Sequence, residues 1–130
     1  MSAKPPKRET ILIIDDEPAI LEVTGDILNT LGYEVLIAKS GPEAVHLYWQ
    51  QPDRIDLVIL DMVMADLGGE DTFDLLKAIR PDVRVILFSG YSMTGQVQQL
   101  IERGCRGFIP KPFRMADLAK KVRAVLDQES

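Results

Sequence analysis

The sequence alternates between short apolar runs and stretches of helical periodicity, and this alternation is the feature that most limits its fold. The runs have the apolar, partly β-branched composition of strands buried on both faces of a parallel sheet. They lie at 11–14, 34–38, 55–61, 83–88 and 107–109. A helical stretch follows each run, so the sequence predicts five strand–helix units. Because crossovers between parallel strands are right-handed, we expect a doubly wound α/β sheet, a (βα)5 unit with helices on both faces.

Local signals mark the ends of several helices. Pro18 suits the first turn of a helix, and Gly32 is expected to end that helix. Ser40 and Glu43 have the spacing of a capping box at the start of the next helix. Three- and four-residue spacing predicts the buried stripe of the first helix as Ile20, Val23, Ile27 and Leu31. The same spacing predicts the stripe of the last helix as Met115, Leu118, Val122 and Val125.

Size and composition exclude several classes of protein. The 130 residues fit one domain, expected at residues 10–127 after a flexible tail or linker at residues 1–9. The net charge of -5 is opposite to that of a surface that binds nucleic acid. No apolar run reaches the roughly 20 residues of a membrane span. The single cysteine, Cys105, fits a reducing cytoplasm, and a small half-buried residue is a better interpretation of it than a reactive thiol.

Polar side chains stand where four of the predicted strands end. Asp15 and Asp16 follow the first strand, Asp61 ends the third, Ser89 follows the fourth, and the fifth leads into Lys111. The carboxyl ends of parallel strands share one edge of the sheet, so we expect these side chains to meet in one crevice. Each has an ordinary explanation when taken alone, such as a turn, a helix cap or a solvated charge. Their joint placement favours a functional site.

The residue types in this set suit phosphoryl chemistry. Three neighbouring carboxylates repel one another unless a cation lies among them. Mg²⁺ fits better than Ca²⁺, because it binds few carboxylates and completes its coordination with water and phosphate. Lys111 and Ser89 supply a charge and a hydroxyl donor for phosphoryl oxygens, and Asp61 can act as a nucleophile that accepts a phosphoryl group.

Four motifs resemble the receiver domain of bacterial response regulators, the CheY-like domain of two-component signalling. They lie at 11–17, 61–64, 89–92 and 111–113, in the order typical of the family. The resemblance implies a flavodoxin-like sheet with strand order 2-1-3-4-5. It also implies a signalling switch rather than an enzyme. Its partners would be a histidine kinase or histidine phosphotransfer domain that donates the phosphoryl group, and a downstream protein.

The resemblance assigns a role to each residue by its position in these motifs. Asp61 would be the phosphoacceptor, with Ser89 and Lys111 binding the phosphoryl group. Phe108 would be the aromatic switch residue that acts with Ser89 to reshape the face formed by strand 107–109 and the helices on either side of it. The Lys111–Pro112 bond would be cis. The implied magnesium ligands are Asp15, Asp16, Asp61 and the backbone carbonyl of Val63.

The sequence departs from the common family pattern at the positions that tune dephosphorylation. Val63 and Tyr91 stand two residues beyond Asp61 and Ser89, and in the family these positions influence attack by water on the phosphoaspartate. An apolar and an aromatic residue are expected to hinder water and lengthen the lifetime of the phosphorylated state. The alternative is that Tyr91 points to solvent. Phe108 lacks the hydroxyl of the tyrosine that is frequent in the family, so the switch would act through ring packing alone.

Two other functions fit part of the sequence. A magnesium-dependent phosphohydrolase that uses an aspartyl-phosphate normally has a second aspartate two residues beyond its nucleophile, but Glu17 stands at that spacing from Asp15. A docking module that works without phosphorylation has no use for three carboxylates and a lysine at one edge. The sequence leaves open whether the chain is free-standing or part of a hybrid sensor kinase, and whether it forms a homodimer.

Overall fold

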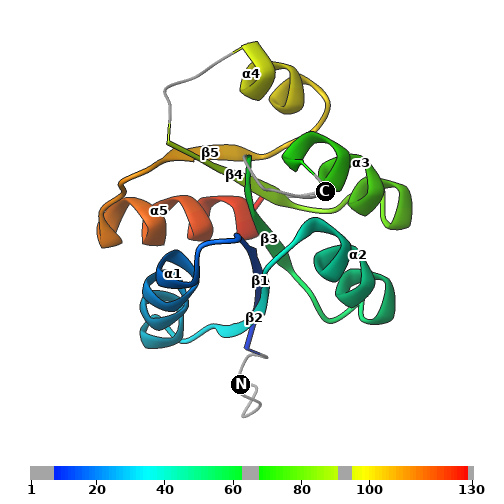
Figure 1. Ribbon diagram of the computed structural model, residues 1–130. Coiled ribbons are helices and arrows are strands. Elements are labelled where there is room, and N and C mark those ends of the chain that lie inside the picture. Colours follow the sequence, from blue (N-terminus) through cyan, green and yellow to red (C-terminus); the bar gives the residue numbers. More distant parts are fainter. Residues whose placement is uncertain (1–7, 63–67, 91–94, 129–130) are drawn as a thin grey trace.

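The computed structural model describes residues 8–62, 68–90 and 95–128, which form a parallel sheet flanked by helices (Figure 1). The elements in chain order are β1 (Thr10–Ile14), α1 (Pro18–Thr30), β2 (Glu34–Ala38), α2 (Gly41–Gln50), β3 (Leu57–Asp61), α3 (Gly69–Ile79), β4 (Val85–Ser89), α4 (Gly95–Glu102), β5 (Gly107–Pro110) and α5 (Met115–Leu126). The strands pair in parallel in the order β2-β1-β3-β4-β5. This confirms the predicted flavodoxin-like α/β fold.

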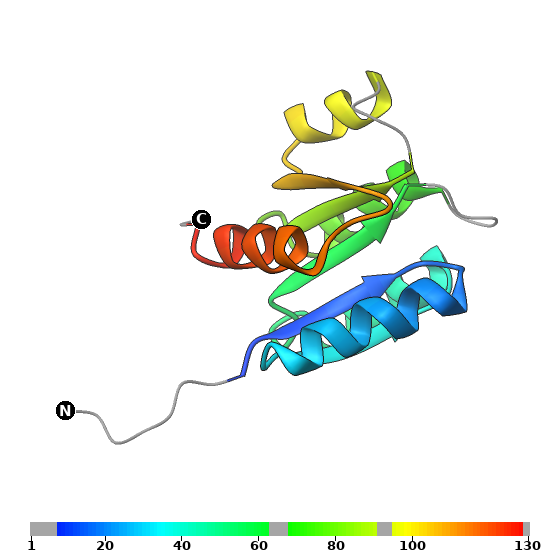
Figure 2. The ribbon, with the colours of Figure 1, turned by 90° about the vertical axis from the view of Figure 1, so that its left-hand side faces the viewer.

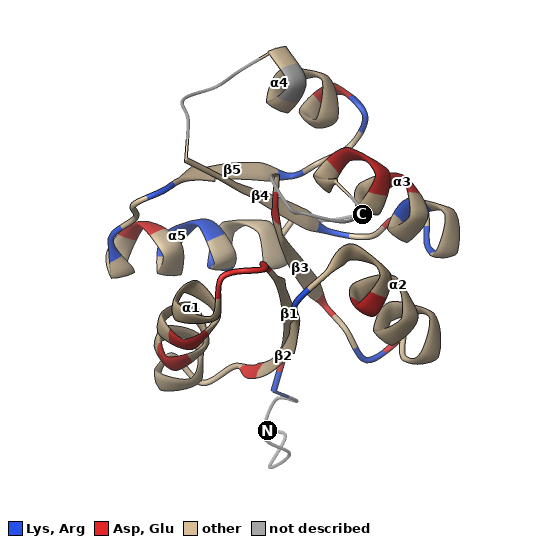
Figure 3. Cartoon of the chain, in the orientation of Figure 1, with Lys and Arg blue, Asp and Glu red and all other residues tan. Residues whose placement is uncertain are grey.

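The helices cover both faces of the sheet. Helices α1 and α5 lie on one face, in front of the sheet in Figure 2, and α2, α3 and α4 pack on the other. Because side chains alternate along a strand, β1 sends Leu12 into the α2–α4 core and Ile13 into the α1–α5 core. Figure 3 shows that the charged residues lie mainly on helices and at strand ends, which leaves the strands as a largely apolar layer.

Most of the predicted helix boundaries are confirmed. Pro18 begins α1, and Gly32 follows that helix with a φ of 100°, a conformation that glycine adopts without strain. Ser40 caps α2 by accepting a hydrogen bond from the Glu43 amide at 3.2 Å. Strand β3 begins two residues later than predicted because Asp56 forms side-chain and backbone hydrogen bonds with Thr10, both at 2.8 Å.

The buried face of α1 is not the predicted one. Residues Leu21, Thr24, Gly25 and Leu28 are buried. Val23 is instead 54% exposed and Leu31 41% exposed, while Ile20 and Ile27 lie at the margin of the core. Both stripes have three- and four-residue spacing, so the spacing could not choose between them. Gly25 belongs to the face that packs on the sheet, where a Cβ atom would lie 3.8 Å from Cγ1 of Val35 in β2, an ordinary van der Waals distance.

Two further side chains clarify the packing. Met115, predicted to be in the buried stripe of α5, is exposed at the first residue of that helix, whereas Leu118, Val122 and Val125 are buried as predicted. Cys105 is buried, and this burial raises the pKa of its thiol to about 12, so the thiol stays protonated at neutral pH.

Among the described helices, none has the length and apolar character that a membrane span requires.

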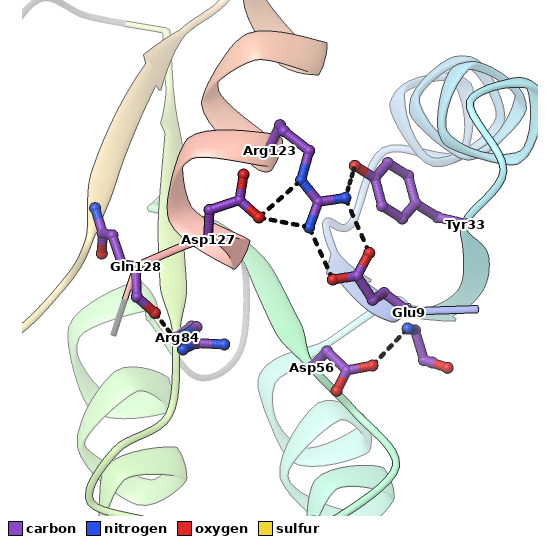
Figure 4. Close-up of polar contacts among 8 residues, drawn as sticks. Glu9, Tyr33, Asp56, Arg84, Arg123, Asp127 and Gln128 are labelled. Carbon is purple, nitrogen blue, oxygen red and sulfur yellow. Dashed lines mark hydrogen bonds and ion pairs between the residues drawn. The ribbon is translucent and has the colours of Figure 1, made fainter. Parts of the chain in front are cut away.

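Polar contacts join the beginning of the described chain to its last helix (Figure 4). Arg123 of α5 donates two hydrogen bonds to the Glu9 carboxylate, at 3.0 and 2.9 Å, and a third to Asp127. Two parallel bonds between a guanidinium and a carboxylate are the strong form of this interaction. Arg8 donates to the Gly32 carbonyl at 3.1 Å. Residues 8 and 9, at the end of the predicted tail, therefore contact the folded domain.

Helix α3 begins in close contact with the end of β3. A Cβ atom on Gly69 would lie 2.8 Å from the Cα atom of Met62 and 3.0 Å from the carbonyl oxygen of Asp61. Real Cβ atoms do not approach backbone this closely, so only glycine fits without a shift of the helix or the strand. A Cβ atom on the preceding Gly68 would meet nothing within 4 Å. Gly69 thus fixes the spacing between α3 and the strand end that carries Asp61.

Replacing one leucine on each candidate face of α1 by alanine tests which face is buried. We expect Leu28→Ala to lower the free energy of unfolding by about 2–4 kcal/mol, because Leu28 is fully buried. We expect Leu31→Ala to lower it by at most about 0.5 kcal/mol. Urea denaturation followed by circular dichroism measures both, and equal losses would contradict the observed orientation of the helix.

The close approach at Gly69 gives a second matched pair. Gly69→Ala should lower the free energy of unfolding by about 1–3 kcal/mol, because the added methyl group must displace backbone atoms of β3 or α3. Gly68→Ala should change it by no more than about 0.5 kcal/mol. The same denaturation experiment compares them, and a neutral Gly69→Ala would show that the helix can move aside freely.

Candidate functional site

The carboxyl ends of four strands place the predicted site residues at one edge of the sheet. Asp15 follows β1, and Asp61 and Ser89 are the last residues of β3 and β4. Lys111 follows β5, and its amide donates to the Ser89 carbonyl at 2.7 Å. Figure 3 shows the acidic segment between β1 and α1 at this edge. The structure thus brings Asp15, Asp16, Asp61, Ser89 and Lys111 to the same end of the sheet.

Three carboxylates form a compact cluster in the crevice. Asp15, Asp16 and Asp61 each offer an oxygen atom, and these atoms lie within 4.8 Å of one another. Asp15 and Asp61 are buried, whereas Asp16 is exposed. The Glu17 amide donates to Oδ1 of Asp15 at 3.0 Å, which helps to hold that side chain in place. Hard oxygen ligands at this spacing, open to solvent on one side, fit a divalent cation such as Mg²⁺.

The Lys111 ammonium lies among these carboxylates. Its Nζ atom is 2.8 Å from Oδ2 of Asp15 and 3.3 Å from Oδ1 of Asp61. Burial favours the neutral amine, but the hydrogen bond to Asp15 and the charge of Asp61 outweigh it and raise the pKa of Lys111 above its ordinary value. Lys111 is therefore a cation at neutral pH. The Lys111–Pro112 bond is cis, as the resemblance implied.

Ser89 and Phe108 lie on neighbouring strands. Ser89 is 3% exposed, and the strand register places Phe108 opposite Leu87, two residues before Ser89. Phe108 and Leu87 belong to the same core cluster, on the α2–α4 face. Since side chains alternate, Ser89 points toward that face as well. Phe108 also lines a hollow of about 390 Å³ over β5 and α5.

Two of the residues assigned by resemblance lie outside the described part of the chain. These are Val63, the expected backbone ligand, and Tyr91, which was expected to tune dephosphorylation with it. Two other residues at the site were missed in the sequence analysis. Gly69 is the second of two adjacent glycines, and nothing in the sequence shows which of them meets the end of β3. Phe88 was interpreted as one apolar residue of a strand, and no local signal distinguishes it from its neighbours.

Comparisons with known proteins agree with this geometry. The family model of the response regulator receiver domain matches residues 11–123. Sporulation initiation phosphotransferase F of Bacillus subtilis is 30% identical over 122 residues, which are 94% of this chain and 97% of that protein. The transcriptional regulator NtrC of Azospirillum brasilense is 35% identical over 93% of this chain. The sensor kinase CckA of Brucella abortus is 32% identical over 92% of it.

The chain spans only 25% of that NtrC and 13% of that CckA. Among solved structures, a receiver domain protein of Clostridium thermocellum superposes with a TM-score of 0.87 and 31% identity, covering 92% of this chain and 94% of that one. A chain of the CheX-CheY-BeF3-Mg²⁺ complex of Borrelia burgdorferi superposes with a TM-score of 0.88 and 26% identity, covering 92% and 90%. The family match, the shared fold and the acidic crevice together show that this chain belongs to the response regulator receiver domain family.

Proposed function

We propose that the chain is a phosphorylation-controlled switch in which Asp61 accepts a phosphoryl group from a phosphohistidine. Receiver domains of response regulators act as signalling switches and interact with histidine kinases. The donor would be such a kinase or a histidine phosphotransfer domain. The observation that carries the proposal is the position of the Asp61 carboxylate, which shares one crevice with two other carboxylates and the Lys111 ammonium.

In the proposed reaction, a carboxylate oxygen of Asp61 attacks the phosphorus atom of the phosphohistidine. The new P–O bond forms as the P–N bond breaks, and the electron pair of that bond leaves with the imidazole. The Lys111 ammonium, already within 3.3 Å of Asp61, turns to a phosphoryl oxygen and stabilises its charge. The Ser89 hydroxyl donates to another phosphoryl oxygen. The chain thus contributes mainly positioning and charge.

Mg²⁺ is the metal that this donor set fits best. Asp15, Asp16 and Asp61 would hold it, with the Val63 carbonyl as a further proposed ligand. When bound, the metal would neutralise charge on the transferring phosphoryl group. The Borrelia burgdorferi complex with a similar chain contains BeF3 and Mg²⁺, which supports this proposal.

The proposed switch is a shift between two conformations of the receiver domain. Phosphorylation would favour the state in which Ser89 moves toward the phosphoryl group and Phe108 turns inward. Support comes from their placement on adjacent strands of one face. The downstream protein would bind the α4–β5–α5 face. Its hollow over β5 and α5 combines the apolar rings of Phe108 and Phe113 with the cations of Lys120 and Lys121.

The outer stripe of α1 is the proposed contact for the phosphodonor. Val23 and Leu31 are exposed on this helix, and its first residue, Pro18, is two positions after Asp16. An apolar face that begins beside the crevice would hold a partner helix where its phosphohistidine reaches Asp61.

The phosphohydrolase alternative has no comparable support, because the family match is to receiver domains and Glu17 replaces the second aspartate of that enzyme class.

The proposed phosphoacceptor is tested with acetyl phosphate and Mg²⁺. We expect intact-mass spectrometry to show the addition of one phosphoryl group to the wild type. Asp61→Asn and removal of the metal with EDTA should each abolish it. Asp53→Asn is the matched control, because the Asp53 side chain is 98% exposed and outside the crevice, and it should be phosphorylated like the wild type. Labelling that persists in Asp61→Asn would refute the site.

The lifetime of the phosphorylated state tests the proposed roles of Val63 and Tyr91. The double variant Val63→Asn, Tyr91→Glu should release phosphate about tenfold faster than the wild type, equivalent to about 1.4 kcal/mol of activation free energy, because polar side chains help to position the attacking water. Phosphate release from purified phosphoprotein measures the rate. An unchanged rate would mean that neither residue shields the phosphoaspartate.

A further inference from the structure

Phe88 lies beneath the Lys111 ammonium. The Nζ atom of Lys111 is over the Phe88 ring, 5.9 Å from its centroid. The ring is 1% exposed and packs against Phe113, two residues before α5, with 5.1 Å between the centroids and a tilt of 34°. The backbone is fixed as well, because Phe88 pairs with Asp61 in the register of β3 and β4 and accepts a hydrogen bond from the Met62 amide at 3.0 Å.

This environment matters because a lysine ammonium is a mobile, strongly hydrated charge on a flexible chain. The Lys111 side chain is only 15% exposed, so part of its hydration is replaced by the surrounding groups. Asp15 and Asp61 supply two of these contacts, and the face of the Phe88 ring supplies a third. A cation over an aromatic face is attracted to it, and the attraction is larger where water is excluded.

We propose that Phe88 is a positioning residue for phosphoryl transfer, whose ring holds the Lys111 ammonium in the crevice within reach of Asp61. This role rests on the proposed phosphorylation of Asp61. Phe88 itself touches no phosphoryl group and acts only through Lys111. When the ammonium turns from the carboxylates to a phosphoryl oxygen, the ring keeps it from moving out toward solvent. An aliphatic residue of similar size would fill the core but provide no such attraction.

Phe73 provides a matched control for the loss of a buried ring. It is also 1% exposed and also lies beneath cations, with Lys77 Nζ 5.7 Å from its ring centroid. It belongs to α3 and packs in the α2–α4 core, whereas Phe88 packs in the α1–α5 core. Phe73→Leu therefore removes a comparable ring and a comparable cation contact without removing the contact with Lys111.

The experiment measures the rate constant for phosphorylation of Asp61 by acetyl phosphate and Mg²⁺. Phe88→Leu should lower it about tenfold, and Phe73→Leu should leave it within about twofold of the wild type. In a Lys111→Met background, Phe88→Leu should have no further effect, because the group it positions is gone. An equal loss in Phe73→Leu, or an undiminished effect of Phe88→Leu in the Lys111→Met background, would overturn the role.

Nuclear magnetic resonance gives a second measurement that needs no phosphorylation. The Cε protons of Lys111, assigned by their absence in Lys111→Met, should be shifted upfield by the ring current of Phe88. The shift should vanish in Phe88→Leu and persist in Phe73→Leu. Unchanged Lys111 signals in Phe88→Leu would overturn the proposed contact. A wild type that acetyl phosphate does not phosphorylate would instead overturn the proposed function. Phe88→Met serves for both measurements if circular dichroism shows that Phe88→Leu does not fold.

Discussion

The site depends on one cation held among carboxylates that would otherwise repel one another. A parallel sheet brings all its carboxyl ends to one edge, and here the ends of β1 and β3 deliver three like charges to that edge. The Lys111 ammonium contacts two of these carboxylates and crosses from β5 to β1 to do so. This contact links one edge strand to the centre of the sheet. A change at Asp61 therefore acts directly on Lys111, which follows β5, the strand that carries Phe108.

The sequence was sufficient to predict the sheet and the convergence of its strand ends. Buried strands of a parallel sheet are apolar along their whole length, so the polar residue that ends each one stands out, as Asp61 does after Leu60. The right-handed crossover then leaves few arrangements of five such strands. The strand order itself came from the resemblance to receiver domains, because periodicity does not specify which strands are neighbours.

Features that depend on packing between elements could not be predicted in this way. Helix α1 has two stripes with the same spacing, and packing against the sheet buries the one that includes Thr24 and Gly25. The requirement for glycine at position 69 arises from the backbone of Met62, which belongs to another element. The contact of Phe88 with Lys111 joins residues of different strands. Each of these features is a contact between different elements of the fold, and a sequence pattern does not specify such contacts.

The contact between Glu9 and Arg123 has a consequence for how this domain transmits force. It ties the incoming chain to α5 at the end of the domain away from the crevice, so a load applied to the chain before residue 8 acts on that helix as well as on β1. Because α5 also borders the hollow lined by Phe108, this contact joins the residue before β1 to the helix that forms one wall of the hollow. Glu9 therefore couples the beginning of the folded domain to that surface.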